Sequence, residues 1–334
     1  VYIHYRVGVV VGARQIYFGD PLHKTDLSSS SNLLQATETV YWNTGQWFSP
    51  PSAMGNIMAA APLPTRNTQH GHAECMEHCD DGVFSVQTNV APRSAWAEQS
   101  LVKHALLKTG AAGPYALDLM DGDQVFRSRH GIQTLRSAAA EATTLLNPFE
   151  PINGEILDMM NGDATQQLRF TSLVNFTRGR RFCCTVYPMV SLRERWSRGF
   201  VTLNLNPTDI IPDGSRSWEG IWSLPERWGG IVQFVSGIFT GEDRLFMICW
   251  NPVTKRKTLV EMTLDEGADE FDDGTTSRIS CQLWTRAISY KDFFRETQFV
   301  SGTVMLKDVQ GTVDVGEWYR VNGDGEWKFW RKQR

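Results

Sequence analysis

The sequence predicts an all-β protein built from a repeated unit of three to four strands. Short runs of β-branched and aromatic residues, typical of strands, alternate with Gly, Pro, Asn and Asp, which are typical of turns. The clearest unit spans residues 230–264. Strands are expected there at 231–239, 244–250 and 258–263. Similar patterns recur upstream, and aromatic residues make up 11% of the chain, which fits heavy cross-strand packing. A β-propeller-like repeat domain is therefore expected over residues 1–264.

The units are placed by matching this pattern along the chain. Laying 176–177 on 239–240 aligns the fourth unit with the fifth, and residues 218–222 are a candidate for a fourth, outer strand. A radial arrangement of such units leaves only short, protected sheet edges, as in a β-propeller. A large irregular sandwich with coincidental hairpins is the alternative. The units are expected near 1–48, 49–90, 111–137, 166–207 and 230–264.

Several elements between the repeated runs are also predicted. Residues 1–20 are expected to form a strand, a turn and a second strand, followed by an exposed polar loop at 26–32. A hairpin is expected at 38–48. A short helix is expected at 94–109, with Ser94 as its N-cap and Gly110 as its terminator. The Ala-rich stretch 137–163 is expected to be a helical excursion from the repeat.

A second region follows an acidic stretch at 265–275. That stretch is expected to be a solvated linker, because it lacks the spacing of Asp residues that folds a loop around calcium. Four strand-like runs in 276–334 predict a small β-sandwich-like domain. About 60 residues bury too small a fraction of their surface to be robust alone. The aromatic side chains of this region also have more surface than a four-stranded sheet can bury on one of its faces. Some of this apolar surface should therefore be exposed, and large exposed apolar patches usually mark interfaces. An intersubunit or interdomain interface is therefore expected at Phe299, Trp318, Trp327, Phe329 and Trp330.

Net charge, the length of apolar runs and the number of cysteines indicate which partners and surroundings the protein is expected to have. The formal net charge of −4 does not indicate a nucleic-acid-binding or membrane-surface protein. No run of about 18 apolar residues is present, so no membrane insertion is expected. The six cysteines are expected to be buried free thiols, as in a protein made in a reducing cytosol. Because the sequence opens inside an apparent strand, further residues are expected before Val1.

A segment rich in His and Cys at 70–79 carries residue types that zinc favours. On a strand, His72 and His78 would lie on one face and Cys75 and Cys79 on the other, so these ligands do not converge. A structural strand is expected, and neither a metal site nor a cofactor is assigned.

Other motifs also favour structural interpretations. The nearest approach to a sialidase Asp-box, at 213–218, has a displaced glycine, and no carboxylates pair at a suggestive spacing. No P-loop, HExxH or GxSxG motif is present, so no enzymatic activity is expected. The basic clusters 178–181 and 255–257 are expected to be solvated turn tips. Asn175 matches a glycosylation pattern but falls inside an expected strand.

Two segments resemble structural proteins of tailed bacteriophages. The run DGDQVFRSRHGIQTLRSA at 121–138 resembles blade hairpins of such proteins. The segment 299–330 resembles their ending Leu-Trp-x-Ser…Gly-x-Val-Asp-x-x-Val-x-Tyr-Arg-Pro-Asp. Here Met305-Leu306 replaces Leu-Trp, Lys307 replaces Ser, and Val321-Asn322 replaces Pro-Asp. These motifs are structural, and the similarity extends over about two thirds of the chain.

The resemblance implies a virion component of the tail nozzle or hub type, assembled in the host cytoplasm. Its partners would be further copies of itself and other tail proteins, with a passing contact with genomic DNA if it lines a tail conduit. The alternative is a carbohydrate-binding or carbohydrate-active propeller protein, with exposed Trp218, Trp222 and Trp228 stacking on sugars. A third class is a cellular propeller that serves as a platform for protein interactions.

Overall fold

The structure is a computed structural model of the chain. It describes residues 7–11, 14–18, 27–29, 47–48, 55–67, 73–86, 102–107, 109–120, 122–129, 131–135, 168–186, 199–206, 218–263, 268–279, 314–319, 326 and 328–333. Within these residues the protein is nearly all-β, as the sequence predicts, and its strands form several small antiparallel sheets. The chain divides into two compact units, Val1–Leu264 and Asp265–Arg334.

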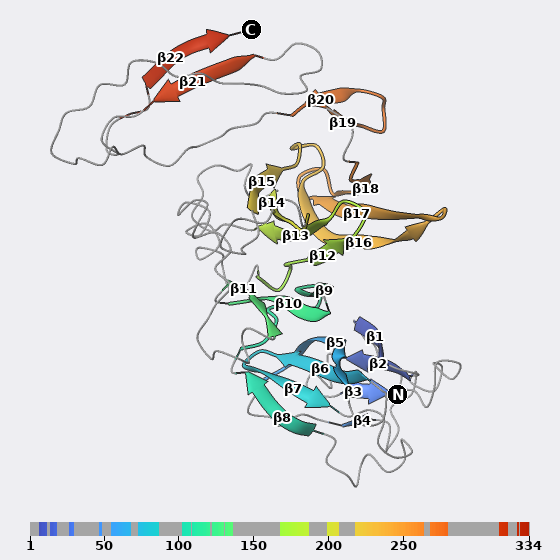
Figure 1. Cartoon of the computed structure of the whole chain (residues 1–334). Coiled ribbons are helices and arrows are strands. Elements are labelled where there is room, and N and C mark those ends of the chain that lie inside the picture. The colour runs from blue at the N-terminus through green and yellow to red at the C-terminus, as the bar shows by residue number, and fades with distance from the viewer. Residues whose placement is uncertain are drawn as a thin grey trace, which may run out of the picture. The chain divides into compact units, whose positions relative to one another are not determined.

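The described residues of the first unit form five antiparallel sheets, each a meander in which neighbouring strands follow one another in the chain (Figure 1). The first sheet holds β1 (Val7–Val11), β2 (Arg14–Phe18), β3 (Leu27–Ser29) and β4 (Trp47–Phe48). The second holds β5 (Ile57–Asn67), β6 (Ala73–Cys79), β7 (Gly82–Val86) and β8 (Val102–Leu107). The third holds β9 (Leu117–Met120), β10 (Asp123–Ser128) and β11 (Gly131–Thr134). The fourth holds β12 (Leu173–Phe176), β13 (Arg181–Val186), β14 (Gly199–Asn204) and β15 (Trp218–Ser223). The fifth holds β16 (Gly230–Phe239), β17 (Glu242–Asn251) and β18 (Arg256–Glu261).

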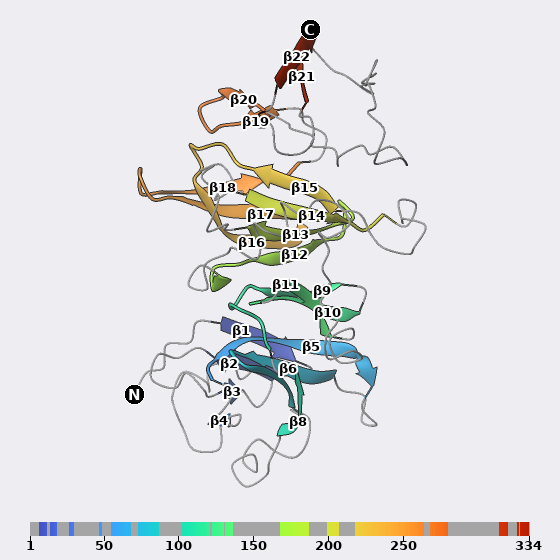
Figure 2. The same ribbon diagram turned by 90° about the vertical axis from the view of Figure 1, so that its left-hand side faces the viewer.

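Successive sheets of this unit meet through their first strands. Strand β1 contacts β5, β5 contacts β9, β9 contacts β12, and β12 contacts β16. In Figure 2 the first and second sheets lie at the bottom of this unit, the third lies above them, and the fourth and fifth lie above the third. Hydrogen bonds join them: Leu173 N donates to Tyr115 O at 2.8 Å, and Phe234 N donates to Ser172 Oγ at 2.9 Å. The repeat is therefore a series of sheets, each packed on the next.

The core lies between these sheets. The central strands β7, β10 and β13 are buried on both faces along almost their whole length. One apolar cluster joins the third and fourth sheets and includes Phe182, which is 0% exposed. Burying one such side chain contributes about 2–3 kcal/mol.

The predicted strands of the fifth sheet are confirmed. All three form, and β16 and β17 turn through Thr240 and Gly241, with φ of 53° and 84°. A two-residue hairpin turn with positive φ at both positions matches the twist of the flanking strands, and Gly adopts that conformation without strain. The candidate fourth strand at 218–222 is also confirmed, since β15 pairs with β14.

Two local predictions are wrong. The segment 26–32, expected to be a polar loop, contains β3, which pairs with both β2 and β4. The described part of the expected helix at 94–109 is β8, the outer strand of the second sheet. Pairing with neighbouring strands satisfies the backbone N–H and C=O groups in both places and overrides local propensity. The expected hairpin tip at 43–45 and the helical excursion at 137–163 lie outside the described residues.

The described part of the second unit consists of two hairpins. Strand β19 (Ala268–Glu270) pairs with β20 (Thr276–Arg278), and β21 (Val315–Tyr319) pairs with β22 (Lys328–Gln333). The expected acidic linker thus includes β19 and the turn after it. In that turn Asp273 Oδ1 accepts a hydrogen bond from Thr275 N at 3.0 Å. Residues 280–313, which cover much of the predicted small domain, lie outside the described residues.

Candidate functional site

The hairpin of β21 and β22 carries three of the five residues expected to form an interface. Trp318 pairs with Phe329 across the hairpin, and their rings meet edge to face with centroids 4.9 Å apart. Side chains alternate between the faces of a strand, so Tyr319 and Trp330 lie on the opposite face, where their ring centroids are 6.3 Å apart. The hairpin therefore carries an aromatic pair on each of its two faces.

All four rings of this aromatic hairpin are exposed. The exposed fractions are 58% for Trp318, 42% for Tyr319, 51% for Phe329 and 41% for Trp330. A two-stranded hairpin is marginally stable by itself, so aromatic surface of this kind gains most from a contact that covers it. Tyr319 lies in the aromatic-rich segment 299–330 for which the interface was predicted, and its ring contact with Trp330 depends on the pairing of the two strands. Phe299 and Trp327 lie outside the described residues.

The basic cluster at 178–181 does more than solvate a turn, contrary to the sequence prediction. Arg178 N donates to Asp243 Oδ2 at 3.0 Å, and Arg178 Nη1 donates to Glu242 Oε2 at 2.8 Å. These bonds join the β12–β13 turn to the β16–β17 turn, and thus the fourth sheet to the fifth. Arg181 makes a bidentate pair with Glu219 at 2.7 and 2.9 Å. The second basic cluster, at 255–257, is exposed as predicted.

Two of the three tryptophans expected to bind sugars are buried. Trp218 and Trp228 are each 6% exposed, so neither can stack on a ligand, and the prediction is wrong for them. Trp222 is 40% exposed, and its Nε1 donates to Thr202 Oγ1 at 3.0 Å. Trp218 lies at the start of β15 and packs into the apolar cluster of the third and fourth sheets, a contact that the pattern of residues along the strand does not reveal.

The segment 70–79 forms the expected strand β6 over its described part, and its polar residues are buried. Burial lowers the pKa of His78 to about 4, so this imidazole is neutral and its Nε2 lies 3.0 Å from Gln124 Oε1. Gln124 Nε2 in turn donates to Ala61 O at 2.9 Å and to Pro62 O at 3.1 Å. This network ties the second sheet to the third and is structural.

Glu77 lies on the opposite face of β6 from His78. Its side chain is 0% exposed, and neither carboxyl oxygen has a hydrogen-bond partner among the residues that the structure describes. Burial raises the pKa of this carboxyl well above its ordinary value, which favours the neutral acid. Cys75 and Cys79 share this face, but side chains on alternate positions of one strand point in parallel and do not converge. Among the described residues, no three His, Cys, Asp or Glu side chains group closely enough to hold a metal ion.

The described cysteines are free and buried, which confirms the prediction for them. They are Cys75, Cys79, Cys183, Cys184 and Cys249. Burial raises the pKa of the Cys183 and Cys249 thiols to about 12, so both are protonated at neutral pH and are poor nucleophiles. Cys281 lies outside the described residues.

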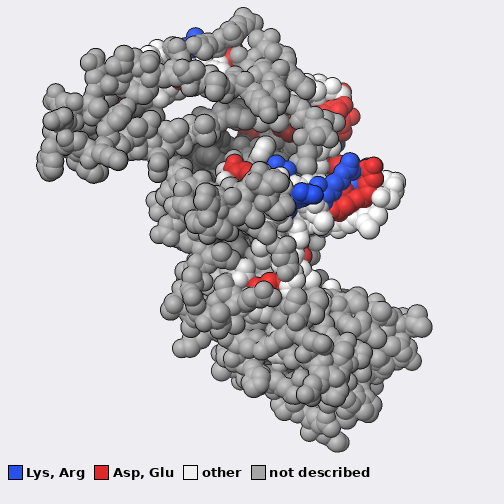
Figure 3. Space-filling view, in the orientation of Figure 1, with Lys and Arg blue, Asp and Glu red and all other residues white. Residues whose placement is uncertain are grey.

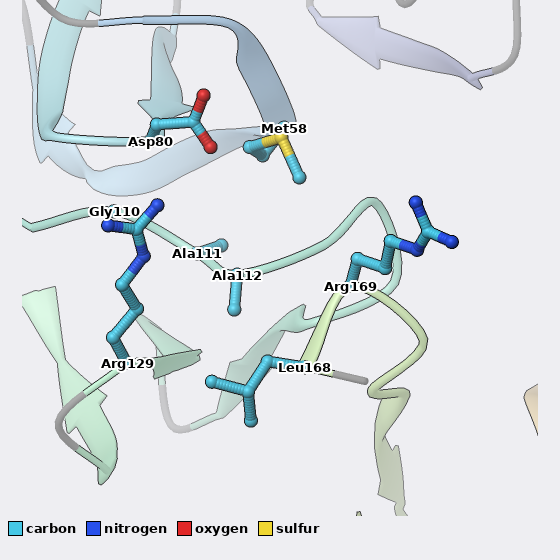
Figure 4. A pocket seen from close by; sticks show the side chains of 8 residues that line it. All are labelled: Met58, Asp80, Gly110, Ala111, Ala112, Arg129, Leu168 and Arg169. Atoms are coloured by element: carbon cyan, nitrogen blue, oxygen red, sulfur yellow. The ribbon is translucent and has the colours of Figure 1, made fainter. Parts of the chain in front are cut away.

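A small cavity of about 180 Å³ opens among the second, third and fourth sheets (Figure 4). In Figure 4 the side chains of Arg129 and Arg169 lie on opposite sides of Ala112. Asp80 Oδ2 accepts hydrogen bonds from Asn56 N at 3.0 Å and from Asn56 Nδ2 at 3.2 Å, so this carboxylate has a structural role. Ligand pockets usually occupy 300–1,000 Å³, and this cavity is smaller. Its lining consists of Met58, Asp80, Gly110, Ala111, Ala112, Arg129, Leu168 and Arg169.

No helix among the described residues has both the length and the apolar character needed to cross a membrane. The sequence matches no protein-family model, and no curated protein is significantly similar to it. The candidate site therefore rests on its own geometry, and the aromatic hairpin is its clearest feature.

Proposed function

We propose that this chain is a structural component of a bacteriophage virion, of the tail nozzle or hub type, that acts by assembly and not by catalysis. The observation that carries the proposal is the aromatic hairpin of β21 and β22. Its Trp318 and Phe329 on one face, and Tyr319 and Trp330 on the other, are all exposed. Tryptophan and tyrosine are enriched among the residues that dominate binding energy at protein interfaces.

The order of the sheets supports a β-propeller-like arrangement for the repeat domain. A propeller blade is typically a four-stranded antiparallel sheet, and neighbouring blades pack side by side around an axis. The five sheets of the first unit have three or four strands each, and their first strands contact one another in succession. We interpret these first strands as the inner strands of successive blades, and we propose a small β-sandwich-like domain for 276–334.

The resemblance of segments 121–138 and 299–330 to tailed-phage structural proteins gives the proposal its biological setting. The partners would be further copies of the chain and other tail proteins in the virion. A protein that lines a tail conduit would also contact genomic DNA in passing. The described part of segment 121–138 is a hairpin made by β10 and β11, which agrees with the blade hairpin that the resemblance implies.

Mass spectrometry of purified virions, followed by localisation in particle images, tests this function. We expect the chain in stoichiometric amount, at the tail, in a symmetric assembly. A strictly monomeric protein that is absent from virions would refute the proposal. In the full chain, Phe329→Ser is expected to weaken assembly, while Val253→Ser, at an 87% exposed turn position of the other unit, is its control.

A carbohydrate-binding role is the second candidate, and one observation favours it. Trp222 is 40% exposed and its ring stacks on Phe200 with centroids 6.4 Å apart, which holds it as a rigid platform. A glycan array with the parent chain and with Trp222→Ala tests this role. Binding that is lost in the variant would support it, and an array without any bound glycan would remove it.

A further inference from the structure

The central strand of the fifth sheet has the composition of a strand that is covered on both faces. Residues 245–250 of β17 form a continuous apolar run, Leu-Phe-Met-Ile-Cys-Trp. Such runs are typical of strands buried on both sides, whereas a half-buried strand alternates between apolar and polar residues. One face of β17 fits this expectation, because Leu245, Met247 and Cys249 are 0–4% exposed.

The other face of the fifth sheet is open. Leu259 of β18 pairs with Ile248 of β17 on this face and is 65% exposed. Phe239 is 41% exposed and meets Phe246 edge to face, with ring centroids 5.0 Å apart. In contrast, the central strands of the second, third and fourth sheets are buried on both faces. We call the surface formed by Phe239, Phe246, Ile248, Trp250 and Leu259 the open face.

Charged residues border the open face. Arg244 lies between two carboxylates, with Nη1 3.5 Å from Glu261 Oε1 and Nη2 3.9 Å from Glu242 Oε2. Figure 3 shows blue and red side chains gathered together where the fifth sheet projects. An apolar centre with a polar border is the usual anatomy of a protein interface.

The first sheet begins the series that the fifth sheet ends. In β2, Ile16 and Phe18 are 0% and 1% exposed, while Tyr17 between them, on the opposite face, is partly exposed. The close contacts among described strands run from β1 through β5, β9 and β12 to β16. In Figures 1 and 2 the first sheet lies beside the second in the lower part of this unit, and the fifth lies beside the fourth in its upper part. Among the described strands, the first sheet therefore makes close contact only with the second sheet, and the fifth sheet only with the fourth.

We propose that the open face binds the first sheet of a second copy of this chain. The contact would repeat the sheet-on-sheet packing that already occurs four times within one chain, from the first sheet to the fifth. Repeat proteins pack each unit on its neighbours, so a terminal unit with an uncovered apolar face accepts another unit of the same kind. The contact joins two different surfaces, so copies add head to tail and form a ring if the rotation closes. The inference rests on the proposed assembly function and identifies one partner and one surface for it.

The first experiment places a charge on the open face of the full chain. Leu259→Arg adds a charge at a position that is 65% exposed in the single chain, so the fold is expected to tolerate it. Val253→Arg, at an 87% exposed position in the β17–β18 turn, is the matched control. Sedimentation velocity over a concentration series should show self-association of the parent and the control, weakened about tenfold or more by Leu259→Arg. A monomeric parent, or a Leu259→Arg variant that associates like the parent, would overturn the inference.

A second experiment does not depend on how that variant folds. A photo-crosslinking amino acid replaces Leu259, and isotopically light and heavy copies of the full chain are mixed before illumination. We expect crosslinked peptides that join a light copy to a heavy copy and map to residues 7–48. Crosslinks confined to one copy, crosslinks to 265–334, or no crosslinks would each count against a second copy as the occupant. Detection of the chain in virions is independent of these outcomes, so the proposed function can hold while this inference fails.

Discussion

Replacing the buried carboxyl of Glu77 by an amide should flatten the pH dependence of stability. Glu77 is 0% exposed, and within the described part of the chain neither of its oxygens has a hydrogen-bond partner. Burial raises its pKa well above the ordinary value of 4.5. Above pH 4.5 the unfolded chain releases this proton while the folded chain retains it. The folded state then binds more protons than the unfolded state, so stability falls as pH rises.

The size of this effect follows from one proton. Each pH unit between the unfolded and the folded pKa lowers the free energy of unfolding by about 1.4 kcal/mol. Glu77→Gln keeps the shape of the side chain and removes the titration. The gain in stability of the variant over the parent should therefore be about 1.4 kcal/mol larger at pH 6.5 than at pH 5.5. An amide without partners is also costly in this place, but that cost is the same at both pH values and cancels.

Urea unfolding followed by tryptophan fluorescence at pH 5.5, 6.0 and 6.5 measures this difference. Other titrating groups, including His78, change stability in parent and variant alike and cancel in the comparison. Glu226→Gln, which changes an exposed carboxyl in a turn, serves as the control. If the difference between Glu77→Gln and the parent does not change with pH, the folded chain does not hold this carboxyl protonated, and the reasoning fails.

Three further predictions use matched pairs of sites. Arg181→Gln should lower the free energy of unfolding, measured with urea, by about 1–2 kcal/mol, because Glu219 loses a partly buried bidentate partner. Arg178→Gln changes an exposed ion pair and should lower it by less than about 0.5 kcal/mol. Gly241→Ala should lower the free energy of unfolding by about 1 kcal/mol, because alanine is strained at the positive φ of this position. Gly229→Ala should lower it by more, because the added Cβ would also lie 2.3 Å from Trp250 O. Equal losses of stability in the two variants would contradict this. In the native chain at most one of the six thiols should react with a thiol reagent within minutes, whereas all six should react in guanidinium. Rapid reaction of two or more native thiols would contradict the burial of the five described cysteines.

The sequence was sufficient to predict the strands whose pattern is local. In the fifth sheet, apolar runs end at turn residues such as Thr240 and Gly241, so strands and turn could both be located. The strand at 27–29 was missed because Leu-Ser-Ser has little strand propensity and forms only by pairing with β2 and β4. The strand at 102–107 was missed because Ala and Leu favour helices, and its partner β7 supplies the information that the segment itself lacks.

The candidate surfaces were predictable in part for the same reason. The number of aromatic residues near the C-terminal end predicts an apolar surface, but the register that pairs Trp318 with Phe329 is a property of the folded hairpin. The open face could not be predicted, because residues 245–250 have the same pattern as a fully buried strand. Arg181 and Glu219 are 38 residues apart in the chain, so their pairing also depends on the arrangement of β13, β14 and β15.

The aromatic hairpin and the open face belong to different compact units, so a double-mutant cycle can tell whether they act separately. Leu259→Arg and Phe329→Ser are made singly and together in the full chain, and the dissociation constant of self-association is measured for each. Free-energy changes at independent sites add within about 0.5 kcal/mol, whereas residues of one shared interface are coupled by more. We expect additivity, because the open face is proposed to bind a second copy while the hairpin is available to another partner. Strong coupling would show that both surfaces serve one contact, and the assembly would then have a single interface where two are proposed.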